Sequence, residues 1–181
     1  MITTLNEIRE YEPCKFGWKK LLAGLGKTCA DNDPLPLSKV LEINGLSDAL
    51  WCLKVITNAD REIRLFAVNC VLQVQGLTPE ELKTLEIVEK FANGQVTSNE
   101  LRMARIEASG QMRNAIGFAV FATTSETADM AAWGACSGAA RAAGWRASYP
   151  MKGYEAKIAA WNKAVAQVVA KQGELFIKHF G

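Results

Sequence analysis

Apolar residues recur every three or four positions along most of this chain, the spacing that places them on one face of an α-helix. The pattern predicts a short helical turn over residues 5–8 and seven longer helices. These are 14–25, 36–43, 47–56, 61–75, 79–92, 128–147 and 154–180. Glycine, proline or asparagine residues separate most of them, which predicts short connections.

Residues 101–119 carry alanines and Met112 at helical spacing, which predicts one long helix. Gly110 and Gly117 weaken that helix by about 1 kcal/mol each relative to alanine. The only short β-rich fragment, 118–121, can equally continue a helix. We therefore predict an all-α fold, a multi-helix bundle of seven to nine helices with solenoid-like helix pairs in the first half.

Several helix starts have recognisable capping residues. Thr78 with Glu81, and Thr97 with Glu100, have the spacing of a capping box, in which the threonine and glutamate side chains bind each other's backbone amides. Ser47 and Asp60 are predicted N-caps of the two helices that follow them.

The segment 128–147 holds nine alanines together with Trp133 and Trp145. Short alanine side chains let helix axes approach closely, so we predict a tightly packed central helix in which the tryptophans fill gaps. The last helix carries Trp161, Leu175 and several other apolar residues in rough period, which predicts a docked C-terminus.

The length of 181 residues predicts one domain over 1–181, with a first block at 1–94 and the long and alanine-rich helices at 95–181. Hydrophobic residues make up 49% and charged residues 22%, which is ordinary for a soluble protein. There is no run of about 18 uncharged apolar residues and no signal-peptide pattern at the N-terminus. We expect a cytoplasmic protein.

Charge is distributed unevenly. Residues 1–100 hold 11 Lys/Arg against 14 Asp/Glu, a net −3, and residues 101–181 hold 10 against 5, a net +5. A basic second half is compatible with nucleic-acid binding. Its cations are spread over about eighty positions rather than clustered, which favours solvated helix faces over a nucleic-acid patch.

The chain shows no constellation that predicts an enzyme, a metal or a cofactor. Its five cysteines lack CxxC spacing, with Cys52 and Cys70 among apolar residues, and the only histidine is His179. Gly26-Lys27-Thr28 lacks the earlier glycine and the strand of a phosphate-binding loop. The group 60–64 and the glutamates of 80–89 are interpreted as helix-end and solvated charges.

Arg141, Trp145, Arg146 and Tyr149 lie within nine residues. Arginine, tryptophan and tyrosine are enriched at interaction hot spots, so these residues are the candidate partner-binding site. The alternative is that the tryptophan belongs to the core.

Five segments together resemble a family of small phage and bacterial proteins described as immunity proteins. They are 16–22 (Phe-Gly-Trp-Lys-Lys-Leu-Leu), 25–27, 36–38, 44–54 (Asn-Gly-Leu-Ser-Asp-Ala-Leu-Trp-Cys-Leu-Lys) and 60–68. The match covers about residues 14–94, and an alanine-rich tail with periodic tryptophans follows, as it does in that family. The resemblance implies an all-helical protein of phages or mobile elements that binds and neutralises another protein, with no catalytic residues to carry over.

We therefore expect a non-enzymatic inhibitor of the immunity or anti-defence type, with anti-CRISPR proteins as one such class, that occludes a bacterial effector or toxin. The alternative is a nucleic-acid-binding accessory protein that uses the basic C-terminal half. A homodimer is compatible with the alanine-rich helices. We expect no membrane contact, no cofactor and no catalytic residue.

Overall fold

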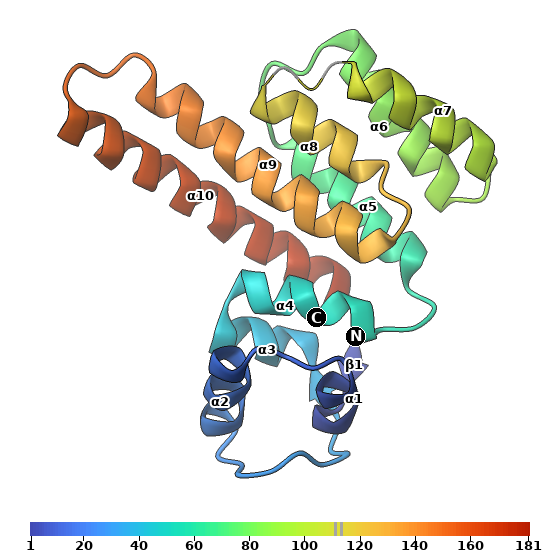
Figure 1. Cartoon of the computed structure of the whole chain (residues 1–181), viewed down its shortest axis with the longest axis vertical. Helices are drawn as coiled ribbons and strands as arrows, with labels where there is room; N and C mark the ends of the chain where they lie inside the picture. The colour runs from blue at the N-terminus through green and yellow to red at the C-terminus, as the bar shows by residue number, and fades with distance from the viewer. Residues whose placement is uncertain (111, 113) are drawn as a thin grey trace.

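The structure is a computed structural model that describes residues 1–110, 112 and 114–181. Over these residues the chain forms ten α-helices, one short 3₁₀ helix and two strands (Figure 1). They are β1 (Ile2–Thr3), α1 (Leu5–Glu10), α2 (Lys15–Gly24), β2 (Leu35–Pro36), α3 (Leu37–Asn44), α4 (Leu46–Cys52), η1 (Leu53–Val55), α5 (Asp60–Leu72), α6 (Pro79–Ala92), α7 (Ser98–Ser109), α8 (Ala115–Thr123), α9 (Ala128–Ser148) and α10 (Tyr154–Phe180).

The predicted all-α fold is confirmed, whereas the predicted count of seven to nine helices was too low. The two strands pair antiparallel, Ile2 with Pro36 and Thr3 with Leu35, and form a minimal sheet beside the first helices. Helices α1 to α4 form one end of the molecule, and α5 to α8 lie on one side of α9 (Figure 1).

The long helix predicted over 101–119 was wrong, because α7 ends at Ser109 and α8 begins at Ala115. Asn114 has an extended backbone, and its Oδ1 accepts hydrogen bonds from the backbone N–H groups of Ile116 and Gly117 at 2.9 Å each. An N-cap satisfies amide groups that only a new helix leaves free, so Asn114 marks a second helix start.

The capping predictions had mixed outcomes. Thr78 and Thr97 each accept a hydrogen bond from the glutamate amide three residues on, and both capping boxes are complete. Ser47 was a wrong choice, because α4 begins one residue earlier, directly after Gly45. Asp60 is itself the first residue of α5 and makes no cap bond, although its charge still favours the positive end of the helix dipole.

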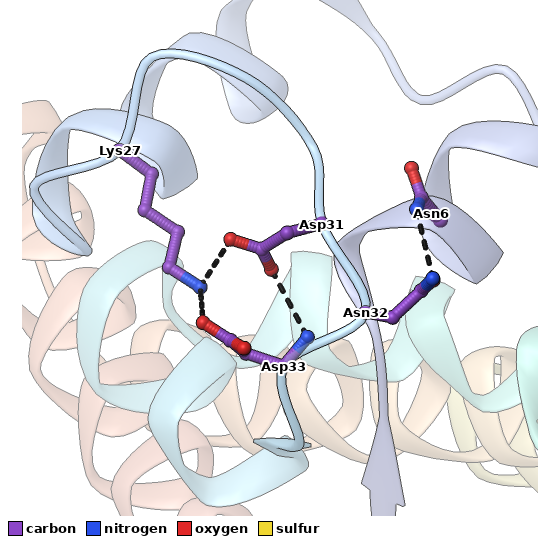
Figure 2. A network of polar contacts seen from close by, with 5 residues as sticks. All are labelled: Asn6, Lys27, Asp31, Asn32 and Asp33. Atoms are coloured by element: carbon purple, nitrogen blue, oxygen red, sulfur yellow. Dashed lines mark hydrogen bonds and ion pairs between the residues drawn. The ribbon is translucent and has the colours of Figure 1, made fainter.

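The loop after α2 is closed by polar contacts (Figure 2). Lys27 Nζ lies 2.6 Å from Asp31 Oδ2 and 2.7 Å from Asp33 Oδ2. Asn6 of α1 donates a hydrogen bond to Asn32 Oδ1 at 2.8 Å. These exposed contacts give the loop a defined path against α1 and contribute little free energy of unfolding, because water competes for every partner.

Helix α9 occupies the centre and packs against α5, α8 and α10. Its small residues allow a very close approach to α8: a Cβ on Gly138 would lie 2.7 Å from Ala119 Cα, and one on Gly134 would lie 2.6 Å from Ala122 Cβ. The predicted tight central helix is thus confirmed. The role predicted for Trp133 and Trp145 was wrong, because both side chains are exposed and alanines fill the interior.

The C-terminal end of α10 is docked, as predicted. Phe176 and Phe180 are buried and meet Phe66 of α5 edge to face, with ring centroids 5.8 and 5.2 Å away. The amino group of Met1 donates a hydrogen bond to the carbonyl of Phe180. The two ends of the chain therefore lie close together, as the N and C marks in Figure 1 show.

Candidate interaction surface

The far ends of α9 and α10, with the turn between them, extend beyond the other helices (Figure 1). We call residues 141–171 the arm. Between Tyr154 and Lys171, no residue of α10 is buried, whereas the end of the same helix buries Gln172, Phe176 and Phe180. The arm is held together by Trp161, which packs over Gly144 and meets the Trp145 ring edge to face at 5.3 Å.

The four predicted partner-binding residues all lie on the arm, near the C-terminal end of α9. The side chains of Trp145 and Tyr149 are 60% and 86% exposed. Arg141 is also exposed, and Arg146 donates a hydrogen bond to the carbonyl of Gln75, in the loop after α5. The exposure of Trp145 contradicts the alternative that this residue belongs to the core.

A groove runs between the start of α8 and the end of α9, lined by Met112 and by residues within 114–118 and 141–146. One part, of about 300 Å³, is lined by Phe118, Arg141 and Trp145 among others. The second part, of about 420 Å³, is lined by Ile116, Trp145 and Arg146 among others. Trp145, Asn114 and Ala115 line both parts, whereas Arg141 lines only the first part and Arg146 only the second. We call this the α8–α9 groove.

The arm is strongly basic. It contains six Lys/Arg and one Glu, which makes its net charge +5. The ion pairs in the described part of the chain all lie between residues 27 and 90, so none of them neutralises a cation of the arm. A surface with this charge attracts acidic partners and repels basic ones.

Sequence reasoning missed part of this surface. Phe118 of α8 and Tyr154 of α10 are 40% and 79% exposed, and Phe118 lines the first part of the groove together with Trp145. Tyr154 is the first residue of α10 and directly follows the N-cap Gly153, which has a positive φ of 87°. The sequence did contain a signal for an exposed Tyr154, because an aromatic residue beside a predicted chain reversal often lies at the surface. The sequence gave no such signal for Phe118, because its segment was interpreted as the interior of a longer helix.

The phosphate-loop-like sequence at 26–28 has a structural role. Lys27 binds two carboxylates, which raises the pKa of its amine and lowers that of Asp31 through their hydrogen bond. A lysine neutralised by its own loop is not presented to a phosphate. This agrees with the interpretation from the sequence.

Two cysteines, Cys52 and Cys70, have a shifted pKa, and in both the shift is upward, which disfavours the reactive thiolate. Burial raises the pKa of Cys52 to about 12, assisted by the charge of Asp48. Cys70 lies 3.4 Å from the sulfur of Cys136, and this contact together with burial raises its pKa. Since the thiolate is the nucleophilic form, both groups remain unreactive near neutral pH. Cys52 and Cys70 are core residues, as predicted from their apolar surroundings.

The charged group at 60–64 is structural, as interpreted. Arg64 is buried and donates hydrogen bonds to the carbonyls of Ser125 and Glu126, at 2.9 and 2.6 Å, which ties α5 to the loop before α9. Arg61 donates to Asn93 Oδ1 at 3.1 Å. Glu86, on the acidic face of α6, forms an ion pair with Lys90 at 2.6 Å. Over the described residues, no group of three or more His, Cys, Asp or Glu is placed to hold a metal ion.

None of the helices in the described ranges combines the length and the apolar character needed to cross a membrane. No protein-family model, curated protein or solved structure matches the chain. The resemblance to immunity proteins therefore stays a prediction, and the case for function rests on the arm and the groove.

Proposed function

We propose that this protein is a non-enzymatic inhibitor of phage or mobile-element origin that works in the bacterial cytoplasm. It binds a bacterial effector or toxin and occludes the effector's working surface, as immunity and anti-defence proteins do, with anti-CRISPR proteins as one such class. The observation that carries this proposal is the arm, which presents Trp145, Tyr149 and Tyr154 to solvent.

Exposed aromatic rings are costly to leave in water unless a partner covers them, and clusters of them mark interaction sites. Tryptophan, tyrosine and arginine also contribute most of the binding free energy at protein interfaces. The arm keeps this surface away from α1 to α4, so an effector can contact it without displacing the core (Figure 1). Occlusion requires no catalytic group, only a complementary surface.

The test is capture of proteins from a bacterial lysate on the immobilised chain at low and at high salt, with mass spectrometry of what is retained. Wild type is compared with an arm variant that carries Tyr149→Ser and Tyr154→Ser. A Phe16→Ser variant is the matched control, because Phe16 lies on α2 at the other end of the molecule and is 81% exposed.

We expect one salt-resistant protein that wild type and the control retain and the arm variant loses. Purified, that protein should lose its own activity when the wild-type chain is added. If no protein is retained at high salt, or if the arm variant and the control lose it equally, the proposal is wrong.

The alternative is a nucleic-acid-binding accessory protein, and the net charge of +5 over residues 141–171 favours it. Binding to phosphates releases counterions, so the affinity would fall steeply as the salt concentration rises. Retained nucleic acid that disappears at high salt, with no protein left behind, would select this alternative. A homodimer through the exposed apolar side chains would appear instead as concentration-dependent sedimentation.

A further inference from the structure

We propose that the α8–α9 groove binds an acidic segment of the partner protein, in which carboxylates pair with Arg141 and Arg146 and an apolar side chain packs on Trp145. This inference rests on the proposed function and names the chemistry of the partner surface. It comes from three features of the groove that are independent of the resemblance to immunity proteins.

The first feature is the charge of the groove itself. The lining residues that the structure describes include no aspartate or glutamate, so they offer the groove's cations no acidic partner. Arg146 is held in place by its hydrogen bond to the carbonyl of Gln75, and Arg141 is exposed at the opposite part of the groove. Guanidinium groups bind carboxylates through paired hydrogen bonds, which makes an acidic side chain the natural occupant of each part.

The second feature is the apolar wall between the two cations. The indole of Trp145 lines both parts of the groove, and Phe118 and Ile116 lie across from it. The edge-to-face contact with Trp161 supports the indole from the α10 side and limits its motion. A segment that alternates acidic and apolar side chains would offer a carboxylate to the arginine of each part and an apolar side chain to the indole that both parts share.

The third feature is the continuity with the rest of the arm. Four more lysines, at positions 152, 157, 163 and 171, extend the positive charge along the arm, against the single Glu155. These exposed cations attract an acidic surface over a distance and increase its rate of association. A protein fits better than a nucleic acid, because the groove combines an apolar wall with two arginines, of which Arg146 is held by its hydrogen bond to Gln75, whereas a nucleic acid needs cations that follow its backbone.

The probe is a short fluorescein-labelled peptide of alternating glutamate and leucine, and binding to the full chain is measured by fluorescence anisotropy. The same peptide with lysine for glutamate and a labelled oligothymidine serve as comparison probes. Three variants are measured: Arg141→Glu, Arg141→Lys, and Lys19→Glu. Lys19 is an exposed residue of α2, so its reversal changes the net charge by the same amount as Arg141→Glu but far from the groove.

We expect the glutamate peptide to bind and the lysine peptide not to bind. Arg141→Glu should weaken binding by about tenfold or more, which corresponds to loss of one charge-assisted contact, and Arg141→Lys should weaken it less. Lys19→Glu should change the affinity by no more than about twofold, since its charge is screened at that distance. Thermal unfolding of each variant verifies that the fold is retained.

Equal weakening by Arg141→Glu and Lys19→Glu would show general charge attraction and overturn the inference. Tighter binding of oligothymidine than of the glutamate peptide, lost in Arg141→Glu, would assign the groove to nucleic acid instead. If the partner captured from lysate depends on Tyr149 and Tyr154 but not on Arg141, the inference fails while the proposed function stands. If the peptide binds as expected but no host protein is captured, the groove does bind acidic segments and the proposed inhibitor function is wrong.

Discussion

At one end of α10, Phe176 and Phe180 are buried against Phe66, and at the other end Tyr154 lies in solvent, as do Trp145 and Tyr149 near the end of α9. The helix carries aromatic residues at both ends, but the first set closes the core and the second is left uncovered. Burial of the first set contributes to the free energy of unfolding, whereas exposure of the second contributes nothing to it. Burial in the core explains the docked end, and the uncovered aromatic residues of the arm are the basis of the interaction that we propose.

The largest effect on this contrast is expected from Phe176→Ala. The side chain is fully buried, so its removal leaves a cavity and should lower the free energy of unfolding by about 3–5 kcal/mol. Urea denaturation followed by circular dichroism measures the change. A loss below about 1 kcal/mol would mean that the aromatic cluster does not hold α10 against α5.

A smaller effect is expected at the contact between α8 and α9. Gly138→Ala places a Cβ 2.7 Å from Ala119 Cα, and the two helices must move apart to remove this steric clash. The substitution should therefore lower the free energy of unfolding by about 1–3 kcal/mol. Gly173→Ala is the matched control: it also lies within a helix, but no other side chain or neighbouring backbone lies within 4 Å of its added Cβ. That variant should be more stable than wild type by up to about 1 kcal/mol. Equal effects of the two substitutions would contradict the close approach of α8 and α9.

A weaker, pH-dependent effect is expected from His179 near the docked end. Burial lowers its pKa below 6.5, assisted by Lys178, while Glu62 opposes the shift. The unfolded chain therefore binds the proton on His179 more readily than the folded chain does. The contribution of His179 to the free energy of unfolding is fully present above about pH 6.5 and is lost as the pH falls through the pKa of His179 in the folded protein. His179→Gln, which keeps an acceptor near Asn69 Nδ2, should reduce this slope in denaturation measured between pH 5 and 7. If His179→Gln leaves the pH dependence of stability unchanged, a group other than His179 is responsible for it.

The smallest effect on stability is expected on the arm. Tyr149→Ser and Tyr154→Ser should each change the free energy of unfolding by less than about 0.5 kcal/mol, because both side chains are mostly exposed. The arm variant that carries both substitutions should nevertheless lose partner capture. A large loss of stability in either variant would mean that the arm supports the fold, and would remove the contrast between the two ends of α10.

Part of the candidate site was predictable. The four residues from Arg141 to Tyr149 form a local run on one helix, so their composition alone identified them. The groove was not predictable, because its other wall is α8, and α8 was hidden within a predicted long helix until Asn114 was seen to begin it. Exposure was not predictable either: Trp133 and Trp145 were expected to fill gaps, but the interior is already filled by alanine side chains at close helix contacts.

The sequence by itself determined the all-α class, the two threonine capping boxes and the tight packing of the alanine-rich helix. These depend on interactions within a few residues or on side-chain size, and both are written in the local pattern. Only the tertiary structure decided which aromatic residues are buried and where α8 and α9 form a groove. Helical spacing says which residues share a face, but whether another helix covers that face depends on contacts between residues far apart in the chain.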